Sequence, residues 1–196
     1  MRLEKIAIWR ETGLFTEQED GSRGYLGFVR GAFVGDEISI DAGQLHIPAE
    51  AQYEYETLLR AKAVVAAITT PGMSQSEKFQ TCYNWVIKHY YNTRRIFQNQ
   101  TSWPALYAND YFLTGSQGGD CFSDSCTFAY LARALGYKNV YVCVDTDLFD
   151  DSGHCWAEIN GLVYDPLFSE AKNYYKYFGA TYASYGLSPI RRVRVN

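Results

Sequence analysis

Four stretches of the chain place apolar residues at every third or fourth position, which is the spacing of one face of an amphipathic helix. These stretches cover about residues 49–69, 74–90, 103–113 and 121–135. Pro48 suits the first turn of the first helix, and Ser74 and Glu77 have the spacing of a capping box at the second. Gly136 is placed to end the fourth. The pattern therefore predicts four helices with defined ends.

A strand and a hairpin follow the last of these helices. Residues 140–144 place valines on one face, as a strand does. The dipeptide Asn160-Gly161 is the one preferred by a two-residue type I′ turn, which fixes the register of the flanking strands. In that register Trp156 lies opposite Asp165, and His154 is the diagonal neighbour of Asp165 on the same face. We therefore expect the Asp165 carboxylate to reach the His154 imidazole.

The first 48 residues carry a different pattern. Short apolar runs separated by polar residues and glycines predict strands at about residues 5–9, 25–29, 32–34 and 38–40, with a polar run at 16–23. About 45 residues are few for an independent core. We therefore expect residues 1–48 to add strands to the domain formed by residues 49–196.

The charge and composition of the chain argue against several classes of function. The formal net charge is −4 and no long basic run occurs, which argues against nucleic acid as the main partner. No apolar stretch is long enough to span a bilayer, and the N-terminus carries no hydrophobic signal core. A trimmed chain would look the same, so the sequence leaves a cytoplasmic and a cell-surface location open. The 17 tyrosines and 4 tryptophans suit a large core or a groove for an extended polymer.

Cys121 occupies the first turn of the fourth predicted helix, two turns before Phe128 on the apolar face. The positive end of the helix dipole and the nearby backbone N–H groups favour a thiolate there and could hold an oxyanion. A small buried cysteine is the plainer interpretation of such a residue taken alone. His154 and Asp165 change the balance, because the three together have the order and logic of a nucleophile, its base and an orienting group.

A zinc site is the rival interpretation of the same residues. Its candidate ligands are Cys121, Cys126, Cys143, His154 and Cys155. The chain has no C-x-x-C knuckle, and an odd count of five cysteines does not suggest a disulfide framework. We therefore expect no metal and no other cofactor, and by strand parity we expect Cys155 in the core.

Four segments in this order resemble the core of the transglutaminase-like superfamily, whose members are papain-like Cys-His-Asp proteins. They are Gly119-Asp120-Cys121, the helix that ends at Leu135-Gly136, His154-Cys155-Trp156-Ala157-Glu158 and Val163-Tyr164-Asp165-Pro166. The resemblance covers about residues 115–170 and is closest to bacterial transglutaminase-like and protease-like members. It implies an α+β fold in which the cysteine helix packs on an antiparallel sheet that carries His154 and Asp165.

By this resemblance residues 49–196 form a catalytic domain, with Cys121 as nucleophile, His154 as base and Asp165 as its partner. The expected reaction is acyl transfer at amide bonds of a protein or peptide, cell-wall peptide included, with water as the favoured acceptor. A protein-glutamine transglutaminase and a non-catalytic module that binds peptide or cell-wall glycan stay open as alternatives. The residues considered as a second oxyanion donor or substrate contact are Tyr91, Trp103, Gln117 and Trp156.

Overall fold

The computed structural model describes residues 6–9, 13–17, 23–27, 40–41, 44–45, 49–88, 102–113, 119–146 and 153–195, with side chains from residue 53 onward. The chain divides into two units, one formed by residues 1–56 with residue 196 and the other by residues 57–195. The boundary falls within helix α1, which spans Ala49–Ile68. Pro48, expected in its first turn, lies outside the described residues.

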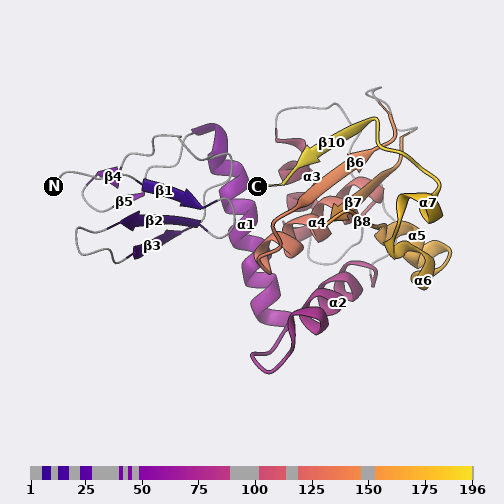
Figure 1. Cartoon of the computed structure of the whole chain (residues 1–196), viewed down its shortest axis with the longest axis horizontal. Coiled ribbons are helices and arrows are strands. Elements are labelled where there is room, and N and C mark those ends of the chain that lie inside the picture. The colour runs from indigo at the N-terminus through magenta and orange to yellow at the C-terminus, as the bar shows by residue number, and fades with distance from the viewer. Residues whose placement is uncertain are drawn as a thin grey trace. The chain divides into compact units, whose positions relative to one another are not determined.

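The second unit combines helices with one antiparallel sheet. Its strands are β6 (Val140–Val144), β7 (Cys155–Ile159), β8 (Leu162–Tyr164), β9 (Phe178–Ala180) and β10 (Arg191–Arg194). They lie side by side in the order β10-β6-β7-β8-β9, and every neighbouring pair is antiparallel (Figure 1). The predicted strand and hairpin form the middle of this sheet.

The helices of this unit precede and follow the central strands. They are α2 (Gln75–Val86), α3 (Trp103–Leu113), α4 (Cys121–Ala134) and three short helices, α5 (Pro166–Ala171), α6 (Tyr174–Tyr177) and α7 (Tyr182–Tyr185). Helix α4 packs against α3 and against β6 and β7. The predicted α+β class is therefore confirmed, with the helix that begins at Cys121 packed on an antiparallel sheet.

The predicted helix ends are confirmed in detail at α2 and α4. Ser74 caps α2 through the Glu77 N–H, and the Glu77 carboxylate accepts the Ser74 N–H, which completes the capping box. Gly136 follows the end of α4 with a φ of +93°, a conformation that glycine adopts without strain. The capping box at the start of α2 and the glycine after α4 thus lie where the sequence predicts these helix ends.

The hairpin between β7 and β8 has the turn that its sequence predicts. Asn160 and Gly161 both have positive φ, at 52° and 83°, as a type I′ turn requires. Ile159 then pairs with Leu162, and Ala157 pairs with Tyr164. Two residues of turn thus set which side chains of β7 face the residue that follows β8.

The first unit contains a three-stranded sheet in the order β1-β2-β3 and a short pair of strands. The strands are β1 (Ile6–Trp9), β2 (Gly13–Glu17), β3 (Arg23–Gly27), β4 (Ile40–Asp41) and β5 (Gln44–Leu45). Strand β2 was not predicted, because the polar run assigned to residues 16–23 overlaps its end. The strand expected at 32–34 lies outside the described residues, and the assignment of residues 1–48 to the same domain stays a prediction.

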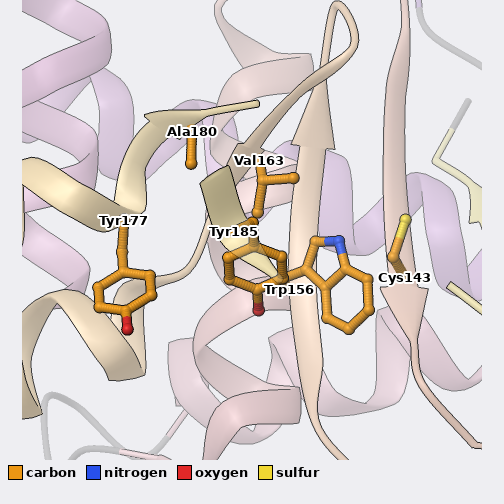
Figure 2. Packing of buried hydrophobic residues seen from close by; sticks show 6 residues of the cluster. All are labelled: Cys143, Trp156, Val163, Tyr177, Ala180 and Tyr185. Atoms are coloured by element: carbon orange, nitrogen blue, oxygen red, sulfur yellow. The ribbon is translucent and has the colours of Figure 1, made fainter. Parts of the chain in front are cut away.

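Aromatic side chains build much of the core of the second unit. The aromatic-rich stretch after residue 173 supplies three of the six residues of one buried cluster, two of them tyrosines (Figure 2). The cluster contains Cys143, Trp156, Val163, Tyr177, Ala180 and Tyr185. Packing is confirmed for Tyr177 and Tyr185, whereas Tyr175 is 90% exposed. The cluster thus packs residues of the C-terminal segment against Trp156 of β7, the strand that follows His154.

Buried thiols make the stability of this core depend on pH. Burial raises the pKa of the fully buried Cys82 and Cys143 to about 12, whereas a thiol in the unfolded chain has a pKa of about 8.5. Below about pH 8.5 both states hold the protons. Above it the unfolded chain loses them first, so the folded state loses about 1.4 kcal/mol per pH unit for each thiol until the folded pKa is reached.

We therefore expect the free energy of unfolding to fall steeply between about pH 8.5 and pH 11. Urea unfolding under reducing conditions, followed at several pH values in that range, measures it. Cys82→Ala is the matched variant, and its free energy should fall less steeply because one titrating thiol is gone. A parent curve that stays flat up to pH 11 would contradict this account of the buried thiols.

Candidate active site

Cys121 is the first residue of α4, directly after the residue that caps the helix. The Asp120 carboxylate accepts the Ser123 N–H at 2.9 Å, and the Ser123 hydroxyl accepts the Asp120 N–H at 2.8 Å. This reciprocal cap was not predicted, although Asp120 and Ser123 have the spacing of one. Cys121 Sγ lies 4.0 Å from the carbonyl oxygen of Gly153, which is the residue before His154.

Glycine is needed just before α4 and just before His154, where a side chain would clash with its neighbours. A Cβ at Gly153 would lie 2.2 Å from Cγ2 of Thr146, and one at Gly119 would lie 2.1 Å from the Ser123 hydroxyl oxygen. Asp145 holds the same loop end, because its carboxylate accepts the His154 N–H at 2.6 Å. Asp145 thus fixes the backbone of the histidine.

His154 and Asp165 meet as the hairpin register predicts. His154 Nε2 lies 2.7 Å from Asp165 Oδ2, and Asp165 is fully buried. The carboxylate also accepts the Phe168 N–H on Oδ1 at 2.9 Å and the Tyr185 hydroxyl on Oδ2 at 2.7 Å. Because a carboxylate in this setting accepts from every neighbour, His154 donates through Nε2–H. The other ring nitrogen, Nδ1, then keeps the lone pair that a base needs.

Two aromatic rings enclose the imidazole of His154. The Phe168 ring is stacked on it, with centroids 4.0 Å apart and an interplanar angle of 14°, and the Trp156 ring centroid lies 6.3 Å away. Lys172 Nζ lies 3.3 Å from the centroid of Phe168, so an ammonium group and the imidazole share this ring. The His154 side chain is 14% exposed, which leaves a small part of the ring accessible.

Desolvation acts on the Cys121 thiol against the effect expected from the helix N-terminus. Desolvation raises the pKa of its thiol well above the ordinary value, and Cys155 and Asp120 raise it further, against a backbone N–H of Cys155 that lowers it. The helix N-terminus alone predicted a thiolate. Desolvation of the partly covered sulfur thus opposes the thiolate that the helix N-terminus favours.

The other cysteines lie in the core, as expected for Cys155. All five cysteines are free thiols, and Cys82, Cys126, Cys143 and Cys155 are fully buried. Among the described residues, no three histidine, cysteine or acidic side chains gather as a set that could hold a metal ion.

The structure describes two of the four residues considered as a second oxyanion donor or substrate contact. Trp103 is 3% exposed and packs edge-on against Phe122, the residue after Cys121, with ring centroids 6.0 Å apart. Trp156 is fully buried, so its ring supports His154 from within the core rather than offering a surface to substrate. Tyr91 and Gln117 lie outside the described residues. Their role, like that of Trp103, stays a prediction.

Two contacts of the site were missed by the sequence argument. Phe168 follows the Asp165-Pro166 start of a helix at the position where a cap bond is made, so the signal for its N–H was present. Tyr185 is separated from Asp165 by 20 residues, and no local pattern connects them.

The helix that begins at Cys121 and the antiparallel sheet on which it packs are consistent with a transglutaminase-like fold. A sequence model of the transglutaminase-like superfamily matches residues 62–176, which is more than half of the chain. The chain belongs to this superfamily, which includes cysteine-dependent acyltransferases and peptidases. No curated protein and no solved structure matched it.

The part of the chain that the structure describes contains no helix long and apolar enough to cross a membrane.

Proposed function

We propose that the protein is a thiol amidase or peptidase that cleaves peptide-like amide bonds with Cys121, His154 and Asp165. The observation that carries the proposal is the 2.7 Å bond between His154 Nε2 and the buried Asp165 carboxylate, next to a helix that begins at Cys121. A histidine oriented in this way beside a thiol is the arrangement used for nucleophilic acyl transfer.

The first half of the reaction forms a thioester. The Cys121 sulfur attacks the amide carbonyl carbon as its proton passes to Nδ1 of His154, and the Asp165 carboxylate stabilises the resulting imidazolium. The carbon–nitrogen bond then breaks, and the imidazolium gives its proton to the leaving amine.

The second half returns the enzyme to its starting state. Water attacks the thioester carbon and gives a proton to His154, the carbon–sulfur bond breaks, and the sulfur regains a proton from the imidazolium. A primary amine in place of water would give transamidation. In both halves the Cys121 backbone N–H, at the end of a helix whose first N–H groups have no partner within it, is the proposed donor to the oxyanion. Trp103 is the described candidate for a second donor.

Product analysis tests the proposed acceptor. The purified protein is incubated with glutamine-containing peptides and a labelled primary amine, and the products are identified by mass spectrometry. We expect shortened or deamidated peptides in the presence and absence of the amine. Incorporation of the amine in place of these products would show a transglutaminase, and unchanged peptides under every condition would contradict amide-bond chemistry on this substrate class.

A non-catalytic module that binds peptide or cell-wall glycan is the second candidate. The burial of Cys121 favours it, because burial raises the pKa of the thiol and so lowers its reactivity in the free protein. The buried bond between His154 and Asp165 favours the enzyme, since a binding module has no need of an oriented imidazole. Binding of peptide without any turnover would decide for the module.

A further inference from the structure

We propose that Tyr185 is a positioning residue of the site: its hydroxyl holds the Asp165 carboxylate in the orientation that keeps a proton on His154 Nε2 and a lone pair on Nδ1. The inference rests on the proposed function. It adds a residue that lies outside the segment matched by the superfamily, which ends at residue 176.

The geometry at Asp165 carries the argument. The Tyr185 hydroxyl and His154 Nε2 both lie 2.7 Å from Oδ2, while Oδ1 accepts the Phe168 N–H. Donors on both oxygens prevent the carboxylate from rotating about its Cβ–Cγ bond. Without the hydroxyl, only the helix-cap bond and the histidine itself would hold it. The Tyr185 bond therefore fixes the acceptor to which the imidazole must align.

The Tyr185 ring is itself fixed by packing. It is 6% exposed and lies between Trp156 and Tyr177, with ring centroids 5.1 Å and 6.1 Å away in edge-on contacts (Figure 2). Its backbone N–H bonds to the Thr181 carbonyl at 2.9 Å, and Gly186 ends α7 with a φ of +90°. The hydroxyl is thus presented to Asp165 by a ring with little freedom to move.

The Tyr185 hydroxyl keeps its proton and so donates its hydrogen bond to Asp165. Burial raises the pKa of Tyr185 far above its ordinary value, and the neighbouring Asp165 carboxylate raises it further. A phenol that keeps its proton beside a buried carboxylate compensates for part of the water that the carboxylate has lost. Tyr185, in the C-terminal segment, thereby supports a triad whose three residues all come earlier in the chain.

Tyr182 provides a matched control on the same short helix. Its hydroxyl also lies close to Trp156, whose indole N–H donates to it at 3.3 Å, but it donates to Glu158 at 2.8 Å instead of Asp165. Tyr182→Phe and Tyr185→Phe each remove one hydroxyl and keep the ring. We expect similar losses of thermal stability from both variants. If Tyr185 had only a structural role, the two variants would therefore behave alike in every other measurement.

The decisive readout is the exchange of the His154 Nε2 proton with solvent, measured by NMR in a protein with three histidines. Tyr185→Phe should speed this exchange by roughly 5- to 50-fold, since one bond to a buried charged group is lost, and Tyr182→Phe should leave it within about twofold. Exchange in Tyr185→Phe that matches Tyr182→Phe would overturn the proposal.

Acylation separates this proposal from the proposed function. With p-nitrophenyl acetate as probe, Tyr185→Phe should slow acylation of Cys121 by a similar factor while leaving the half-saturating ester concentration unchanged. An unimpaired rate would also count against Tyr185. If the parent protein forms no acyl-enzyme at all, the proposed function fails, whereas the exchange comparison still decides the role of Tyr185.

Discussion

Replacing Cys121 with alanine is expected to lower amide hydrolysis by roughly 10⁴-fold or more, with the fold unchanged. The thiol is the proposed nucleophile, and without it no thioester can form, so only binding and oxyanion contacts remain. Alanine is well tolerated in the first turn of a helix, and the Asp120 cap does not involve the replaced side chain. Peptide cleavage measured beside circular dichroism of both proteins separates a lost reaction from a lost fold.

The other thiols near the site are the controls for this variant. Cys126→Ala and Cys155→Ala remove fully buried sulfurs and should cost about 1 kcal/mol of stability, yet retain most of the activity. Cys155 is the more demanding control, because its backbone N–H points toward the Cys121 sulfur and the substitution leaves that N–H in place. Equal loss of activity in Cys155→Ala and Cys121→Ala would show that the nucleophile is misassigned.

Asp165→Asn should reduce the rate by roughly 10²- to 10⁴-fold while leaving α5 intact. Asparagine is an equally good helix cap, so its carbonyl oxygen can still accept the Phe168 N–H. Its amide group must then face the Tyr185 hydroxyl and His154, where a donor meets Nε2–H and forces the imidazole towards the wrong tautomer. Steady-state kinetics at several pH values, with thermal unfolding as the check on folding, measures the effect.

Glu158→Gln is the matched carboxylate-to-amide control on the same sheet. Glu158 is 3% exposed and pairs with Arg192 and the Tyr182 hydroxyl, away from His154. Its replacement should destabilise the protein by roughly 1–3 kcal/mol with little change in rate, because a buried carboxylate loses its ion pair with the half-exposed Arg192 but the imidazole keeps its partner. A rate loss in Glu158→Gln that exceeds the one in Asp165→Asn would contradict the assigned triad.

Much of the site could be predicted from patterns within short stretches of the sequence. The Asn160-Gly161 turn set the register that brings His154 to Asp165, and the apolar spacing after Cys121 located the start of α4. Both depend on interactions within a few residues, which a single sequence records well.

The contacts of the site and sheet that could not be predicted join residues far apart in the sequence. The Tyr185 bond to Asp165 spans 20 positions, and Arg192 reaches Glu158 across 34, so no spacing rule connects either pair. Arg192 lies exposed on β10 and pairs from there with a buried carboxylate, a contact that the sequence did not indicate. The desolvation that raises the pKa of Cys121 was missed for a related reason, since a helix start predicts the dipole but not how much protein covers the sulfur.

Formation of an acyl-enzyme tests the central claim most directly. The protein is mixed with p-nitrophenyl acetate, quenched in acid and mapped by peptide mass spectrometry, in parallel with His154→Ala. The account predicts a burst of p-nitrophenolate and an acetyl group on Cys121 in the parent, and neither in His154→Ala within the same time. Acetylation confined to lysines, or equal acetylation of Cys121 with and without His154, would contradict a thiol nucleophile activated by this histidine.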